Sequence, residues 1–177
     1  MRLDVFRLPK GNLAAKYLAI AVLPLLVLLY TPISNYAVLC FGEKILLETL
    51  PFDPRDILRG DYVRLEYEIQ DIPDGMIPEE AENSGKDSYA VYVSLVRDRE
   101  GIARVLGVSV KRPPDGTYLR ANLRSYWRNR ADYNLGVYYV PEGTGRDLEN
   151  AIREKRVLAD VRVLRGRGVI RKLEIVD

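Results

Sequence analysis

The fold class is decided by a segment that alternates in polarity, Tyr62-Val63-Arg64-Leu65-Glu66-Tyr67-Glu68-Ile69. Every second residue from Val63 to Ile69 is apolar, and the residues between them are charged. This period of two is typical of a β-strand with one buried face, because successive side chains of a strand point to opposite faces. The segment therefore predicts a strand over residues 62–69 with Val63, Leu65, Tyr67 and Ile69 facing a core.

The segments on both sides of this strand predict a mainly β domain. We predict further strands over 44–50, 89–96, 102–111, 117–123, 135–140, 157–164 and 168–176. Gly107 is a predicted bulge, and residues 165–167 are a predicted hairpin turn. Only residues 146–156 have the apolar spacing of a short α-helix. Seven or eight strands with one helix predict an antiparallel sheet that forms a barrel- or sandwich-like domain.

An uncharged run from Tyr17 to Gly42 precedes this domain. About 20 apolar residues are enough to cross a hydrocarbon core of ~30 Å, with Pro24 expected to kink the helix and Pro32 to loosen it. We predict a transmembrane anchor over residues 13–41, after a cytoplasmic N-terminus of residues 1–12 and before an extracytoplasmic domain of residues 42–177. The alternatives are a buried core helix and a cleaved signal peptide, although residues 31–37 offer no small-residue cleavage site.

The charges around the run predict its orientation. The preceding flank carries Arg2, Arg7, Lys10 and Lys16 against Asp4. The positive-inside rule then keeps the N-terminus in the cytoplasm and places the remainder outside it. That remainder carries 23 basic residues (27 less 4) and 24 acidic ones (25 less 1), so its net charge does not favour nucleic acid as a partner.

The chain has no histidine and one cysteine, Cys40. Histidine-based triads, the usual zinc sites and an intrachain disulfide are therefore excluded. We expect neither a metal nor a cofactor.

A charged turn leads into the alternating segment. Its residues are Asp53, Pro54, Arg55, Asp56 and Arg59, followed by Gly60 and Asp61. Proline and glycine favour turns, and the interleaved charges predict an ion-pair network that supports the turn. The two arginines argue against a calcium site, which needs converging oxygen ligands.

Five residues carry a family resemblance: Gly60, Asp61, Tyr62, Leu65 and Tyr67. They reproduce every fixed position of a Gly-Asp-Tyr-x-x-Leu-x-Tyr motif, and the chain resembles the bacterial GDYXXLXY proteins there. The similarity extends through residues 138–145 and Glu149 to the last strand. The resemblance implies a membrane-anchored protein of unknown activity, often associated by genome context with multi-pass membrane proteins.

A second resemblance is to type I signal peptidases, which use a serine–lysine dyad. Gly60-Asp61 with Val63, and Lys111 in its basic tripeptide, are similar to segments of that family. The nucleophile is missing, because Phe52 holds the position of the serine. This resemblance therefore implies a shared scaffold without the catalytic chemistry.

A basic aromatic segment is a possible interface. It contains Tyr126, Trp127, Arg128 and Arg130, preceded by Arg120 and Arg124. Tryptophan, tyrosine and arginine are enriched in interface hot spots. The alternative is a solvated loop with one aromatic residue packed beneath it.

The sequence thus predicts a single-pass membrane protein whose exported domain is an accessory module for an integral-membrane partner. The alternative is an extracytoplasmic hydrolase or carbohydrate-active enzyme that uses paired carboxylates. Asp61 and Glu142 are then the candidate catalytic pair, since a retaining pair needs two carboxyl groups ~5 Å apart.

Overall fold

The structure is a computed structural model that describes residues 13–50, 62–73, 75–82, 88–124, 130–141, 152 and 154–176. The chain divides into two compact units, Met1–Ala37 and Val38–Asp177. We call the second unit the β domain. The strands are antiparallel neighbours throughout, so the mainly β prediction is confirmed.

Helix α1 (Leu13–Phe41) forms the described part of the N-terminal unit and continues into the β domain. It is rich in leucine and alanine, which are strong helix formers. The helix continues through Pro24 and Pro32, so the expectation that it loosens at Pro32 was wrong. Its part from Ile20 to Phe41 is long and apolar enough to cross a membrane.

The junction between α1 and the first strand is a single glycine. The backbone N–H of Gly42 donates a hydrogen bond to the carbonyl of Val38 at 2.8 Å, which closes the last helical turn. Strand β1 (Glu43–Leu50) begins at the next residue. A side chain at Gly42 would meet the backbone, because a Cβ there lies 2.3 Å from the Val38 oxygen.

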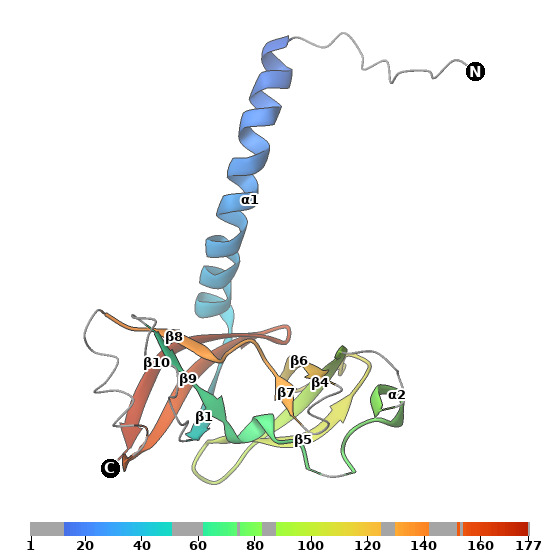
Figure 1. The fold of residues 1–177 in the computed structure, drawn as a ribbon, viewed down its shortest axis with the longest axis vertical. Helices are drawn as coiled ribbons and strands as arrows, with labels where there is room; N and C mark the ends of the chain where they lie inside the picture. The colour runs from blue at the N-terminus through green and yellow to red at the C-terminus, as the bar shows by residue number, and fades with distance from the viewer. Residues whose placement is uncertain are drawn as a thin grey trace. The chain divides into compact units, whose positions relative to one another are not determined.

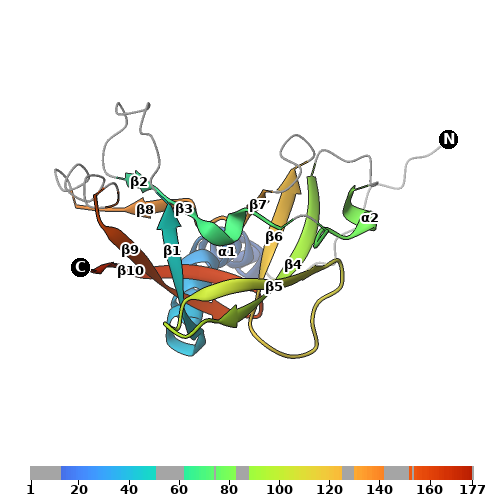
Figure 2. The same cartoon turned by 90° about the horizontal axis from the view of Figure 1, so that it is seen from below.

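The described part of the β domain contains two four-stranded sheets and one two-stranded ribbon. The first sheet has the order β10 (Arg167–Val176), β9 (Arg156–Leu164), β1 and β3 (Glu66–Tyr67). The second has the order β5 (Ala103–Ser109), β4 (Ser88–Arg97), β6 (Tyr118–Arg124) and β7 (Ala131–Asp132). The ribbon pairs β2 (Tyr62–Arg64) with β8 (Val137–Tyr139). Figure 1 shows the hairpin of β9 and β10, and Figure 2 shows β1 and β9 on one side of the domain with β4 and β6 on the other.

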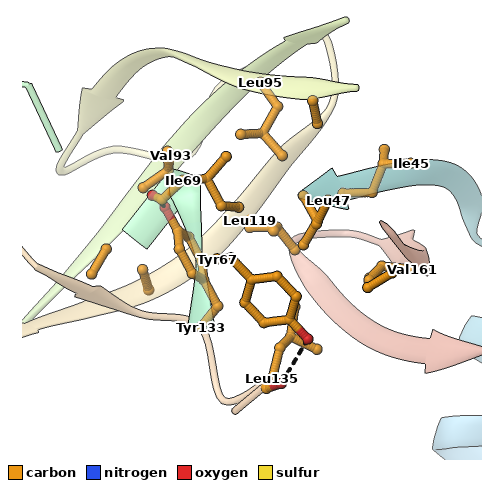
Figure 3. Close-up of a cluster of buried hydrophobic side chains, with 14 of the residues drawn as sticks. Ile45, Leu47, Tyr67, Ile69, Val93, Leu95, Leu119, Tyr133, Leu135 and Val161 are labelled. Atoms are coloured by element: carbon orange, nitrogen blue, oxygen red, sulfur yellow. Dashed lines mark hydrogen bonds between the residues drawn. The ribbon is translucent and has the colours of Figure 1, made fainter. Parts of the chain in front are cut away.

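The two sheets join to give a curled half-barrel. One contact is the parallel bridge between Leu46 of β1 and Ile102 beside β5. A second lies at the β9–β10 turn, where the N–H of Arg120 donates to the carbonyl of Gly166 at 2.8 Å. The inner faces of both sheets thereby share one core, which includes Ile45, Leu47, Val93, Leu119 and Val161 (Figure 3).

The alternating segment confirms the predicted burial but not the predicted single strand. Val63, Leu65, Tyr67 and Ile69 are all buried. The strand is nevertheless divided at Leu65 into β2 and β3, and it ends in the 3-10 turn η1 (Glu68–Gln70). The turn forms because the Gln70 side-chain oxygen accepts a hydrogen bond from the Tyr67 N–H at 3.0 Å. This hydrogen bond occupies the donor that a longer strand would have used for pairing.

The other predicted strands are present, with shifted ends. The predicted bulge is confirmed, since Leu106 is the extra residue beside Gly107 in the β4–β5 pairing. The hairpin turn is shorter than predicted: Leu164 pairs with Arg167, and Arg165 and Gly166 both have positive φ. In the predicted helix over 146–156, Ile152 and Glu154 are helical, Lys155 is in a bend and Arg156 belongs to β9, whereas residues 146–151 and 153 lie outside the described residues. A short helix, α2 (Glu79–Glu82), was not predicted.

Ion pairs connect β1, β5 and β9 on the outside of the domain. The carboxylate of Glu48 accepts hydrogen bonds from Arg156 at 2.7 Å and from Arg104 at 2.9 Å. Arg104 also pairs with Glu68 and Asp98. The hydrogen bond from Arg156 is the main reason that the pKa of Glu48 lies below its usual value. The network therefore stabilises the fold at neutral pH and weakens as the pH falls through that lowered pKa.

Candidate functional site

β3 is the edge strand of the first sheet and β7 is the edge strand of the second. We call the boundary between these two edge strands the seam. At one end the seam is closed by the β2–β8 ribbon and by a hydrogen bond from the Leu65 N–H to the Gly136 carbonyl at 3.0 Å. At the other end it is closed by an antiparallel bridge between Asp71 and Arg130. Between these two joins, the described residues form no backbone hydrogen bond across the seam.

Two buried tyrosines form hydrogen bonds between the two segments on either side of the seam, residues 65–71 and residues 130–136. The hydroxyl of Tyr67 donates to the carbonyl of Leu135 at 3.0 Å, as Figure 3 shows, and the hydroxyl of Tyr133 donates to the carbonyl of Ile69 at 2.7 Å. Burial raises the pKa of both hydroxyls, so both are protonated donors at neutral pH. Tyr67, the last tyrosine of the predicted motif, therefore joins the two sides of the seam, and we call it a structural clamp. Tyr133 is the matching clamp from the opposite segment.

We expect the removal of either hydroxyl to destabilise the protein. Tyr67→Phe and Tyr133→Phe each leave a buried carbonyl without its donor, which costs about 1–3 kcal/mol. Tyr139→Phe is the matched control, because Tyr139 is 78% exposed and its hydroxyl reaches solvent. Urea unfolding of the full chain in detergent micelles measures the three differences. Equal midpoints for Tyr67→Phe and Tyr139→Phe would contradict the clamp.

A groove of about 690 Å³ opens above these tyrosines. Its lining includes Arg64, Glu66, Gln70, Arg130, Asn134 and Val137. Glu66 and Arg130 form an ion pair across the seam. The Asp132 carboxylate accepts a hydrogen bond from the Asn134 N–H at 2.9 Å, which holds Asn134 in a left-handed conformation with a φ of 56°.

Arg64 and Val137 extend the groove onto the outer face of the ribbon. Directly opposed residues of an antiparallel pair share a face, and the register pairs Arg64 with Val137 and Tyr62 with Tyr139. The rings of Tyr62 and Tyr139 pack edge to face with centroids 6.4 Å apart. Exposed aromatic, cationic and apolar side chains therefore adjoin the groove.

The predicted site residues fall partly within the described chain. Tyr62 of the motif lies in the ribbon, and Leu65 lines the groove together with Arg130 of the basic aromatic segment. Tyr67 lies in β3 and hydrogen-bonds to the Leu135 carbonyl. The remaining predicted residues lie outside the described residues: Gly60, Asp61, Asp53, Pro54, Arg55, Asp56, Arg59, Glu142, Tyr126, Trp127 and Arg128. The supporting turn, the interface and the carboxylate pair stay predictions.

Sequence reasoning missed Gln70, Tyr133 and Asn134. Their positions depend on pairing between segments more than 60 residues apart, such as the Tyr133–Ile69 hydrogen bond. The one local signal was the position of Arg64 on the polar, outward face of the alternating segment, which the sequence pattern already indicated.

A second polar feature is a buried carboxylate in the first sheet. Asp160 of β9 is 1% exposed, and its oxygens lie 3.7 Å from Lys44 Nζ and 3.8 Å from Arg162 Nε. Among the residues that the structure describes, none donates a hydrogen bond to either oxygen. The two cations supply charge compensation without directed hydrogen bonds. Within the described ranges, no cluster of acidic, cysteine or histidine residues could hold a metal ion.

Residues 24–173 match the family described as GDYXXLXY protein, so the family predicted from the motif is confirmed. No curated protein and no solved structure matches the chain.

Proposed function

The chain belongs to the GDYXXLXY protein family, and we propose that it is a membrane-anchored accessory module. In this proposal α1 crosses a bilayer once, with the N-terminus in the cytoplasm. The β domain lies on the extracytoplasmic side and binds an integral-membrane partner. It works by recognition rather than by catalysis.

The observation that carries the proposal is the exposed apolar surface of α1. Leu18, Ile20, Leu23, Val27, Leu28 and Ile33 are each more than 60% exposed. Burial of a side chain of this size contributes about 1.5–3 kcal/mol, so a helix that is apolar on all sides needs a covering phase. A hydrocarbon core of ~30 Å provides that phase for the segment from Ile20 to Phe41.

The groove supports recognition in the β domain. Two carboxylates line the groove: Glu66 pairs with Arg130, and Asp132 accepts a hydrogen bond from the Asn134 N–H. A general acid or base needs a group that is free to exchange a proton. The groove also lies within the usual volume range of binding pockets. The paired-carboxylate enzyme requires Asp61 and Glu142, which lie outside the described residues, and it remains the alternative.

The topology is tested with a reporter fused after Asp177. We expect alkaline phosphatase to be active there and a cytoplasmic fluorescent protein to be dark, because the basic N-terminal flank holds residues 1–12 inside. Protease added to intact spheroplasts should remove the β domain.

The control variant reverses the flank with Arg7→Glu, Lys10→Glu and Lys16→Glu. This change should reduce phosphatase activity, because the flank then carries more negative than positive charge. An active cytoplasmic reporter on the unmodified chain would exclude the proposed orientation.

A further inference from the structure

We infer that the β domain binds the headgroups of anionic phospholipids through a basic surface at its junction with α1. This junction surface consists of residues 43–44, 111–120 and 160–167, all of which the structure describes. The inference rests on the proposed function for one point, that α1 crosses a bilayer. It holds for either orientation of the helix.

The three segments of the junction surface contact one another. Strand β1 begins beside the end of β9, because Glu43 pairs with Val163 in the register. The Thr117 hydroxyl donates a hydrogen bond to the Glu43 carboxylate at 2.6 Å, and the Arg120 N–H donates to the Gly166 carbonyl at 2.8 Å. The start of β1, the start of β6 with the loop before it, and the β9–β10 turn therefore form one continuous region.

The charge of the β domain is unevenly distributed, with the positive charge concentrated at the junction surface. Its segments contain seven basic residues and three acidic ones, a net charge of +4. The remainder of residues 42–177 contains 16 basic residues (23 less 7) and 21 acidic ones (24 less 3), a net charge of −5. Six of the basic side chains at the surface are exposed: Lys44, Lys111, Arg112, Arg120, Arg165 and Arg167. A region with this charge attracts anions although the whole domain is nearly neutral.

Two of the three carboxylates of the junction surface are already engaged. Glu43 forms an ion pair with Arg97, which lies outside the surface, at the end of β4. Asp160 is 1% exposed and lies 3.7 Å from Lys44 Nζ and 3.8 Å from Arg162 Nε. Within the surface itself, Asp115 is the one carboxylate left to balance the exposed arginines.

The junction surface begins where the apolar part of α1 ends. The 22 residues from Ile20 to Phe41 span about 33 Å as a helix, close to the hydrocarbon thickness of ~30 Å. Gly42 follows directly, and an added Cβ there would lie 3.0 Å from the Val163 nitrogen and 3.1 Å from the Arg162 Cβ. The end of β9 therefore contacts the residue at which the proposed membrane span ends.

The β9–β10 turn extends past this point. Because β1 and β9 are antiparallel, β9 continues after Val163 toward the side from which β1 enters the domain. A strand rises about 3.3 Å per residue, so Arg165 lies within about 7 Å of Val163. The polar layer of a bilayer is about 5–7 Å thick on each side of the hydrocarbon core, and a guanidinium group can donate two parallel hydrogen bonds to a phosphate.

The test measures lipid binding to the purified full chain in uncharged detergent micelles, by native mass spectrometry with equal amounts of phosphatidylglycerol and phosphatidylcholine. We expect preferential retention of phosphatidylglycerol. Arg165→Gln should weaken its Kd about fivefold, which corresponds to about 1 kcal/mol for one basic residue near an anionic surface. Arg112→Gln combined with Arg165→Gln should weaken it about 25-fold, because independent contributions add as free energies.

The matched control is Arg99→Gln, an exposed arginine in the β4–β5 turn, which should leave the Kd unchanged. The basic flank of residues 1–16 also attracts anionic lipid, but every variant retains it, so its contribution cancels in the comparison. Circular dichroism establishes that Arg165→Gln keeps the sheets. If it does not, Arg112→Gln alone provides the comparison with Arg99→Gln from a different segment of the surface.

Three outcomes would overturn the inference. They are equal retention of the two lipids, an equal loss of affinity for Arg99→Gln and the variants of the junction surface, and tighter binding of inorganic phosphate than of phosphatidylglycerol. The third would identify a free anion as the ligand. None of these results changes the reporter assay, so failure of the junction surface is distinguishable from failure of the membrane topology.

Discussion

Gly42→Ala is expected to destabilise the β domain by about 3 kcal/mol, at the upper end of the usual cost of overpacking. The added Cβ would lie 2.3 Å from the Val38 carbonyl oxygen and 3.0 Å from the Val163 backbone nitrogen. Neither group can rotate away, because both belong to the main chain. The Val38 oxygen is also the acceptor of the Gly42 N–H, so relief of the clash breaks the hydrogen bond that ends α1.

Thermal unfolding of the full chain in micelles, followed by the circular dichroism of the sheets, measures this effect. A loss of 3 kcal/mol lowers the Tm of a domain of this size by about 10 °C. Gly107→Ala is the control, because a Cβ at Gly107 meets nothing within 4 Å and its φ is not positive. If Gly42→Ala and Gly107→Ala have the same Tm, the junction tolerates a side chain and our account of it is wrong.

Gly166→Ala is expected to have the second-largest effect, about 2–3 kcal/mol. Gly166 has a φ of 84°, a conformation that costs other residues about 1–2 kcal/mol. An added Cβ would also lie 2.8 Å from a ring carbon of Tyr118. The Gly166 carbonyl accepts the Arg120 N–H, so displacement of the turn weakens a contact between the two sheets.

Gly116→Ala separates the cost of the positive φ from the cost of the contact with the Tyr118 ring. Gly116 has nearly the same φ, 86°, but nothing lies within 4 Å of its added Cβ. Both variants should lose the conformational part of the stability, and Gly166→Ala should lose more because of the ring contact and the joined sheets. The same thermal unfolding experiment compares the two variants. An equal loss of stability in Gly116→Ala and Gly166→Ala would show that the contact with the Tyr118 ring does not contribute.

The burial of the strands was predictable from local pattern. The period of two from Val63 to Ile69 indicated which side chains face the core, and all four are buried. The hairpin at Arg165 and Gly166 and the bulge beside Gly107 followed from glycine in strand context. The apolar run before residue 42 likewise indicated a helix long enough to cross a membrane. Alternation and run length are properties of neighbouring residues, so a single sequence contains them.

Pairing between distant segments was not predictable in this way. The division of residues 62–69 at Leu65 depends on Gly136, and the groove depends on the Tyr67–Leu135 and Tyr133–Ile69 hydrogen bonds. Each contact joins residues more than 60 positions apart, and nothing in either local pattern specifies the other partner. A β-strand leaves its backbone donors and acceptors open to any neighbour, so the choice of neighbour is made when the whole core packs. The candidate site is a consequence of that choice, since it exists only where two sheet edges meet and do not pair.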